Sequence, residues 1–334
     1  MTGLEAGAVE RTAELIIGRL LAVREGEHVA LVCDGLSEQE MVRALAEAIL
    51  EYGAEYTILE QPSRDTTRKN ELTPIVERGL EAADCLIGLT RSGGAPTYAK
   101  AVKRLLDARA LRSISMVMRS LENFTSGGAL ADYDALHADG RALSQVWRGA
   151  ERIRVRSPGG TDLVAPIAGE DVIIECGFAT EPGQEAAFSD GEVSQMPREG
   201  QASGTLVIDG PIAHLGLPPE PIKLSLDKGA VVDVQGGGEV GDELRRIVEG
   251  VERADNIAEI GIGLNPACRR NGDFEEEKKA RGNVHVAIGD NIFYGGTVEC
   301  AVHMDMVVYK PTVELDGRVV VADGLVRLPD ASMR

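Results

Sequence analysis

The chain has 334 residues, 43% of them hydrophobic, which is enough for two domains that each bury a core. Its 54 acidic and 35 basic side chains give a formal net charge of -19, which disfavours nucleic acids and anionic membranes as partners. The 5 cysteines are scattered, which argues against a disulfide framework, and no window approaches the about 20 apolar residues of a membrane span. We therefore expect a cytoplasmic protein.

The first 150 residues alternate predicted helices and strands. Helices are expected at 4–24, 37–52, 74–83 and 98–108, and strands at 28–33, 55–59, 84–89 and 113–118. This alternation is typical of a doubly wound, mostly parallel sheet. No phosphate-binding glycine motif follows the first strand, so a dinucleotide role is not expected. Arg91-Ser92-Gly93-Gly94 follows the third strand and is either a substrate contact or an ordinary turn.

A helix is expected at 132–151, and the pattern then changes to short strands separated by turns. These strands are expected at 153–156, 162–164, 204–209, 222–226, 230–235, 312–316 and 318–322, with one helix at 242–254. The fold class is therefore α/β. We expect a doubly wound domain over residues 1–150, followed by a β-rich α+β domain over residues 151–334.

Four charged or imidazole side chains of the second domain lie among aliphatic residues. His303 and Asp305 are two residues apart, so they share a face if the backbone is extended. His285 and Glu259 lie in two further strand-like runs. An uncompensated charge in such surroundings is unfavourable, and a divalent metal is the simplest compensation. The alternative is that these residues are structural, with a hydrogen-bonded histidine in the core and a glutamate on the surface. Residue chemistry alone leaves both the metal site and this structural interpretation open.

From Arg152 to Leu325 the chain resembles the metallopeptidases of the aminopeptidase T type. The resemblance is carried by Gly191-Glu192-Val193 before Pro197, by Gly204-Thr205-Leu206, and by the run HVAIGDN at 285–291. It implies two metal ions per chain, zinc, cobalt or manganese, and catalytic roles for Glu192 and for Glu259, which would bridge the ions. The implied ligands are Glu192, Glu259, His285, His303 and Asp305.

The same resemblance implies a metal-dependent hydrolase that cleaves a peptide or amide bond in a small substrate with a metal-activated water. It also implies a homodimer. These peptidases carry a tyrosine seven residues after the first histidine, where this chain has Ile292. Tyr294 would share a face with Ile292 on an extended strand and is the candidate replacement. Arg281 is a candidate for holding a substrate carboxylate.

The chain also resembles the 2,5-dihydroxypyridine 5,6-dioxygenases, mononuclear iron enzymes of the same fold. Shared features are Glu181-Pro182-Gly183, the segment 204–209, the segment 261–267 and the pair His303-x-Asp305. That resemblance implies Fe(II) held by two histidines and one carboxylate. Glu259 departs from it, because a histidine is expected there, and His285 is an additional histidine.

These departures lead us to expect the hydrolase, with a ring-cleaving Fe(II) dioxygenase for a hydroxylated pyridine-like substrate as the alternative. The low aromatic content of 4% offers no clear stacking platform for such a ring. A third interpretation is a closed, inert metal site that stabilises an assembly.

Overall fold

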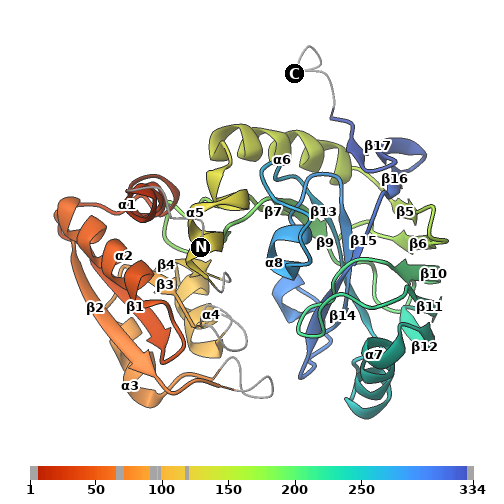
Figure 1. Ribbon diagram of the computed structural model, residues 1–334, viewed down its shortest axis with the longest axis horizontal. Coiled ribbons are helices and arrows are strands. Elements are labelled where there is room, and N and C mark those ends of the chain that lie inside the picture. Colours follow the sequence, from red (N-terminus) through yellow and green to blue (C-terminus); the bar gives the residue numbers. More distant parts are fainter. Residues whose placement is uncertain (1–6, 65–70, 91–95, 97–98, 117–119, 329–334) are drawn as a thin grey trace. The chain divides into compact units, whose positions relative to one another are not determined.

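The computed structural model describes residues 7–64, 71–90, 96, 99–116 and 120–328. The chain divides into two compact units. Figure 1 shows the chain coloured by residue number. The first unit comprises Met1–Leu130 and Cys176–Asp190, and the second comprises Ala131–Glu175 and Gly191–Arg334. Each unit is described here by itself.

The first unit is built around a five-stranded sheet in the order β2-β1-β3-β4-β8, with all neighbouring strands parallel. Its strands are β1 (His28–Asp34), β2 (Glu55–Gln61), β3 (Cys85–Gly88), β4 (Arg112–Met116) and β8 (Glu185–Phe188). Its helices are α1 (Ala8–Glu14), the π-helical η1 (Leu15–Leu20), α2 (Gln39–Glu51), α3 (Pro74–Leu80), α4 (Lys100–Asp107), α5 (Leu121–Thr125) and the 3-10 turn η3 (Gly127–Leu130).

Helices pack against this sheet because its central strands β1 and β3 are apolar and buried on both faces. Ala30 and Val32 of β1 join one buried cluster with side chains of α3 and α4. Val29 and Leu31 alternate with them and therefore point to the opposite face, and α2 contacts β1 and β2. The predicted doubly wound, mostly parallel sheet is confirmed.

The second unit holds two sheets, one of eight strands in the order β12-β11-β10-β6-β5-β16-β17-β18 and one of five in the order β15-β14-β13-β9-β7. Its strands are β5 (Arg152–Arg156), β6 (Asp162–Pro166), β7 (Ile173–Glu175), β9 (Glu192–Gln195), β10 (Ser203–Ile208), β11 (Ile222–Asp227), β12 (Ala230–Gly236), β13 (Ile257–Gly263), β14 (Val284–Gly289), β15 (His303–Val308), β16 (Thr312–Leu315), β17 (Arg318–Ala322) and β18 (Leu325–Val326). Its helices are α6 (Tyr133–Trp147), α7 (Gly238–Gly250), α8 (Phe274–Glu277) and the 3-10 turn η4 (Ile292–Tyr294). The β-rich α+β character expected of this part is confirmed.

The five-stranded sheet of the second unit has a fully buried centre. Every residue of β13 and β14 is buried, and α6 contacts β7 and β9. Any polar side chain on these strands therefore needs a partner inside the protein, because water does not reach it.

The boundary between the units does not lie at residue 150, where we predicted it from the change to a pattern of short strands separated by turns. Helix α6 joins the second unit through β7 and β9, and the segment Cys176–Asp190 returns to the first unit, where β8 pairs with β4. The hydrophobic pattern of a short strand does not reveal which sheet it will join, and this is why the sequence missed the crossing.

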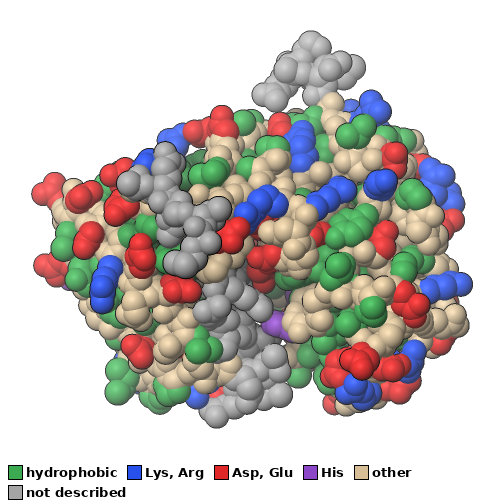
Figure 2. Space-filling view, viewed as in Figure 1, with side chains coloured by type: hydrophobic (Ala, Val, Ile, Leu, Met, Phe, Trp, Pro, Cys, Tyr) green, Lys and Arg blue, Asp and Glu red, His purple; other side chains and the backbone are tan. Residues whose placement is uncertain are grey.

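Acidic side chains are spread over the surface, in keeping with the net charge, and they gather over α7 in Figure 2. On this helix they form ion pairs at the i,i+3 spacing, between Asp242 and Arg245 and between Glu243 and Arg246. Within the described residues, no helix combines the length and the apolar character that crossing a membrane requires.

Candidate metal centre

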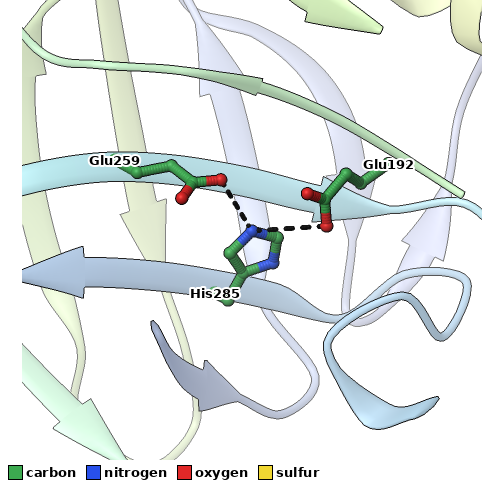
Figure 3. A group of neighbouring side chains, drawn as sticks. All are labelled: Glu192, Glu259 and His285. Atoms are coloured by element: carbon green, nitrogen blue, oxygen red, sulfur yellow. Dashed lines mark hydrogen bonds and ion pairs between the residues drawn. The ribbon is translucent and has the colours of Figure 1, made fainter. Parts of the chain in front are cut away.

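Strand register brings the five predicted ligands to one face of the sheet β15-β14-β13-β9-β7. Glu192 of β9 lies opposite Gly263, and His285 of β14 lies opposite Gly261. Ala287 of β14 lies between Glu259 of β13 and Asp305 of β15. Residues opposite one another in an antiparallel pair share a face, as do residues two apart on one strand. Three of these side chains point toward one another in Figure 3.

Glu259 lies at the middle of the cluster. Its Oε1 lies 3.0 Å from Nε2 of His285, and its Oε2 lies 3.1 Å from Nε2 of His303. Nε2 of His285 also lies 3.5 Å from Oε2 of Glu192, and Nε2 of His303 lies 3.5 Å from Oδ1 of Asp305. The structure thus brings together all five residues that the resemblance implied, although their metal-binding roles stay predictions.

The five side chains form two overlapping groups that share Glu259. One group consists of Glu192, Glu259 and His285, and the other of Glu259, His303 and Asp305. Within each group, one ligand atom per residue lies within 4.8 Å of the others. Nitrogen and carboxylate oxygen donors at this spacing are suited to a divalent metal.

The ring of His303 is fixed in the orientation that metal-binding histidines need. Its Nδ1 lies 2.7 Å from the backbone carbonyl oxygen of Asp290. A carbonyl only accepts hydrogen bonds, so Nδ1 carries a proton and Nε2 faces Glu259 and Asp305. A lone pair at Nε2 would be repelled by the two carboxylates, so this nitrogen favours binding either a proton or a metal ion there.

Without a metal, a proton takes that place. Burial lowers the pKa of His303, but hydrogen bonds to Asp305 and Glu259, together with their charges, outweigh burial and raise the pKa to about 10. The same atom that would bind a metal therefore holds a proton strongly in the metal-free protein, and metal binding must release it.

Two lysines complete the cluster, and no local sequence pattern assigned them to it. Lys278 and Lys279 follow α8, and their Nζ atoms lie 3.2 Å from Oδ2 of Asp305 and 3.0 Å from Oε1 of Glu192, respectively. Burial raises the pKa of the Asp305 carboxyl, but the positive charges of Lys278 and His303 outweigh burial and hold that pKa well below its usual range. In the sequence the lysines belong to an acidic and basic run typical of a solvated surface.

A hydrogen-bonded segment holds the two lysines in place. The side chain of Glu277 accepts from the backbone N–H of Gly272 at 2.6 Å and from the hydroxyl of Tyr309. The carbonyl oxygen of Glu277 accepts from Nδ2 of Asn283 at 2.8 Å. Because Lys278 and Lys279 follow directly, their ammonium groups belong to the built site and are not mobile surface charges.

Tyr294 lies at the site but not on a strand. The segment Ile292–Tyr294 is a 3-10 turn, so the expectation of an extended strand there is wrong; Gly295, with φ of 84°, follows the turn. The buried ring of Tyr294 stacks on that of His303 with centroids 6.1 Å apart. Burial and the charge of Glu259 raise the pKa of this phenol well above its usual value, which keeps it neutral. Its catalytic role remains a prediction.

The sequence suggested two arginines as substrate contacts, and the structure describes only one of them. The guanidinium of Arg281 donates to Oδ2 of Asp139 at 2.7 Å and to the carbonyl oxygen of Leu264 at 3.2 Å. These partners are internal, and substrate binding by Arg281 stays a prediction. The segment Arg91 to Gly94 lies outside the described residues.

Comparison with known proteins gives relatives that span nearly the whole chain. The profile of the family described as 2,5-dihydroxypyridine 5,6-dioxygenase matches residues 18–328. The 2,5-dihydroxypyridine 5,6-dioxygenase of Pseudomonas putida is 26% identical, over 94% of this chain and 95% of its own.

Two solved structures share the fold. The structure of the Pseudomonas putida dioxygenase has a TM-score of 0.81 at 24% identity and covers 96% of this chain and 97% of its own. AmpT from Thermus thermophilus has a TM-score of 0.70 at 20% identity and covers 96% of this chain and 99% of its own. At such identities a structural likeness shows the fold and not the activity.

These comparisons overturn the expected function. A hydrolase of the aminopeptidase T type, and with it a peptidase or metalloprotease activity, is wrong, because the family profile and the curated relative are both named as a dioxygenase. The physical reason for the error is that carboxylate and imidazole ligands serve hydrolytic and oxidative metals alike.

The match of the family profile includes every residue of the cluster built above, from Glu192 to Asp305, and extends over both units. The chain belongs to the 2,5-dihydroxypyridine 5,6-dioxygenase family.

Proposed function

We propose that this protein is a metal-dependent dioxygenase that opens the ring of a hydroxylated pyridine. The observation that carries the proposal is the family match over residues 18–328, which contains the buried cluster of Glu259, His303 and Asp305. In such a reaction both atoms of O2 enter the substrate and one ring bond breaks, so no separate reductant is consumed.

The residues present fit a divalent metal. Glu259, His303 and Asp305 offer two carboxylates and one imidazole, and the proton on Nδ1 of His303 leaves its Nε2 available. The resemblance implied two histidines and one carboxylate around iron, so Glu259 makes this set harder and more anionic than expected. The resemblance to this family implies Fe(II) in place of the zinc, cobalt or manganese pair expected of a hydrolase.

When bound, a redox-active ion supplies the electron transfer that O2 needs to react with an aromatic ring. Lys278, whose Nζ lies 3.2 Å from Asp305, offers a positive charge to an ionised substrate hydroxyl. The Tyr294 ring supports the His303 ring by stacking, and burial of the ligand carboxylates keeps bulk water from the reacting atoms.

Oxygen uptake tests the proposal directly. Metal-free protein is loaded with Fe(II) under anaerobic conditions and mixed with air-saturated 2,5-dihydroxypyridine in an oxygen electrode. We expect one O2 consumed per substrate, with loss of the ring's ultraviolet absorbance, and no uptake with protein loaded with Zn(II). A panel of mono- and dihydroxypyridines identifies the preferred ring. If no hydroxypyridine supports oxygen uptake, the proposal fails.

The homodimer implied by the resemblance stays a prediction. Size-exclusion chromatography with light scattering is expected to give twice the 35.5 kDa mass of the chain. A mass of one chain across the micromolar range would contradict it.

A further inference from the structure

We infer that Glu199 is a positioning residue for the candidate metal centre, and that it acts by anchoring the β14–β15 loop, residues 290–302, in the conformation that supports His303. Glu199 lies outside the cluster of candidate ligands, on the turn between β9 and β10. The inference rests on the proposed function only in taking a metal ion at the cluster.

The β14–β15 loop contacts the imidazole of His303 with two of its residues. The carbonyl oxygen of Asp290, the first residue of the loop, lies 2.7 Å from Nδ1 of His303. The buried ring of Tyr294 stacks on the imidazole, with centroids 6.1 Å apart and an angle of 20° between the planes. Partners of this kind orient a histidine that binds a metal, so the conformation of the loop decides where the imidazole points.

Hydrogen bonds within the loop tie its beginning to its end. The side chain of Asp290 accepts from the backbone N–H of Ile292 at 3.1 Å and from that of Cys300 at 3.0 Å. Oδ1 of the buried Asn291 accepts from the backbone N–H of Val298 at 2.9 Å, and the N–H of Asn291 donates to the Val298 carbonyl at 3.1 Å. The loop therefore moves as one body, and its position depends on what it is attached to.

Glu199 attaches this loop to a distant segment of the chain through three hydrogen bonds. Its Oε1 accepts from Nδ2 of Asn291 at 2.9 Å and from the backbone N–H of Thr297 at 2.6 Å, and its Oε2 accepts from the Thr297 hydroxyl at 2.7 Å. The hydrogen bond from the Thr297 N–H, followed by those from its hydroxyl and from Asn291, outweighs burial and lowers the pKa of Glu199. The acceptor is therefore an anion, and hydrogen bonds to a carboxylate are stronger than those between neutral groups.

Asn291 connects Glu199 to the aromatic ring at the site. The backbone carbonyl of Asn291 accepts from the N–H of Tyr294 at 3.0 Å and from that of Gly296 at 3.1 Å. A Cβ at Gly296 would lie 2.2 Å from Cγ of Asn291, so the chain packs directly on this amide. Because Glu199 holds the amide, a displacement of Asn291 would move the turn η4, and the Tyr294 ring with it.

The turn that carries Glu199 is itself fixed to the eight-stranded sheet. The backbone N–H of Arg198 donates to the carbonyl of Pro166, at the end of β6, at 2.8 Å. A Cβ at Gly229, in the turn between β11 and β12, would lie 2.7 Å from Cα of Gly200, so the two turns are in close contact. Glu199 therefore holds the β14–β15 loop against a rigid support and not against another mobile segment.

Hydrogen exchange of the metal-free protein, followed by mass spectrometry, tests whether Glu199 anchors the loop. Glu199→Ala removes the three hydrogen bonds. Glu199→Gln keeps them, because its amide oxygen accepts from both N–H groups and its amide nitrogen donates to the rotatable Thr297 hydroxyl. We expect exchange at residues 290–302 to become at least about 10-fold faster in Glu199→Ala and to stay within about 2-fold in Glu199→Gln. Exchange at residues 222–236, in β11 and β12, should not change.

The Fe(II) affinity of the same variants tests the positioning role. The dissociation constant is measured without oxygen and without denaturant, by competition with a coloured chelator. We expect an increase of about 10-fold in Glu199→Ala and less than about 2-fold in Glu199→Gln. Since the variants stay folded under these conditions, a loss of global stability alone would leave the dissociation constant unchanged.

Two further variants complete the set. Thr297→Val removes one of the three donors at an exposed position, so it should change exchange and affinity in the same direction as Glu199→Ala, but less. Glu249→Ala, on the exposed surface of α7, is the matched control and should change neither quantity.

Unchanged exchange at residues 290–302 in Glu199→Ala would overturn the inference, as would equal effects of Glu199→Ala and Glu199→Gln. Faster exchange with an unchanged dissociation constant would overturn the positioning role. Neither measurement uses substrate or O2, so an iron-loaded protein that takes up no oxygen removes only the proposed dioxygenase. Wild-type protein that binds no Fe(II) would contradict the positioning role and the proposed function alike.

Discussion

The two ring nitrogens of His303 have different partners, and this makes it the residue on which the candidate centre depends most. Truncation to alanine removes the only imidazole whose tautomer is set for a metal by a backbone carbonyl among the described cluster residues. The side chain is 29% exposed, so little packing is lost.

For His303→Ala we therefore expect loss of Fe(II) binding and of oxygen uptake. The metal-free variant should keep the fold, with a free energy of unfolding lowered by about 1 to 3 kcal/mol relative to the metal-free wild type, because the protonated ring no longer neutralises Glu259 and Asp305. Iron content, oxygen uptake and urea unfolding followed by circular dichroism measure the three quantities. Turnover at the wild-type rate would refute the assignment of His303.

Gly261 is a second residue at the candidate centre, because it leaves the space that the His285 ring occupies. In Gly261→Ala the new methyl group would lie 2.1 Å from Nε2 of His285, so the ring must move and its hydrogen bond to Glu259 must lengthen. We expect a loss of about 1 to 3 kcal/mol in the free energy of unfolding and a weaker affinity for Fe(II).

The matched control is Gly250→Ala at the end of α7. A Cβ there meets no atom within 4 Å, and alanine favours helix. The control should be neutral or stabilising by up to about 1 kcal/mol, with unchanged iron binding. Equal effects of both substitutions would show that the contact with His285 is not what matters.

At the scale of elements, most helices and strands follow from local patterns. The strands around Glu259, His285 and His303 were predicted from their β-branched and apolar runs, and they form β13, β14 and β15. The short strands β7, β8 and β9 were not predicted, because three or four residues carry too little periodicity. The turn at Ile292–Tyr294 was mistaken for a strand because its residues are apolar and aromatic, which fits either structure.

Strand β8 carries a half-buried carboxyl with a clear pH signature. Burial, aided by the charge of Asp107 and opposed by that of Lys103, raises the pKa of Glu185 to about 7. The unfolded chain releases this proton at a lower pH than the folded protein does. Stability is therefore lost as the pH rises from the unfolded pKa through about 7, and it stays lower above that.

Glu185→Gln removes this dependence. We expect no difference from wild type near pH 4 and a gain of about 1 to 3 kcal/mol in the free energy of unfolding at pH 8. Urea unfolding at both pH values measures the difference, with Glu47→Gln on the exposed surface of α2 as the control. A gain of the same size at both pH values would contradict the buried-carboxyl explanation.

At the scale of the whole molecule, the buried carboxylates link metal binding to folding. An ion that binds only the folded state at 100 times its dissociation constant adds about 2.7 kcal/mol of stability. In a protein of two units of this size, chelation should lower the melting temperature by about 5 to 10 °C.

Calorimetry of the Fe(II) form and of protein treated with EDTA, both without oxygen, measures this shift. His303→Ala serves as the control and should melt at the same temperature in both states. If the wild type also melts identically in both, no ion is bound at the cluster in the folded protein.

The sequence by itself determined the fold class, the strands that carry Glu259, His285 and the pair His303 and Asp305, and the identity of these four clustered residues. Glu192 came only from the resemblance to a known family. The sequence could do so because hydrophobic periodicity is local and because charged side chains among aliphatic residues are conspicuous. It also led to the wrong reaction, since the same ligand types serve hydrolysis and oxidation.

Only the tertiary structure decided which partners each side chain has. The buried ammonium groups of Lys278 and Lys279, the carbonyl of Asp290 behind His303 and the glycine beneath His285 come from separate segments of the chain. Strand register and loop packing bring them together, and no local pattern encodes a contact between distant segments. The difference between two similar histidines is therefore a property of the fold.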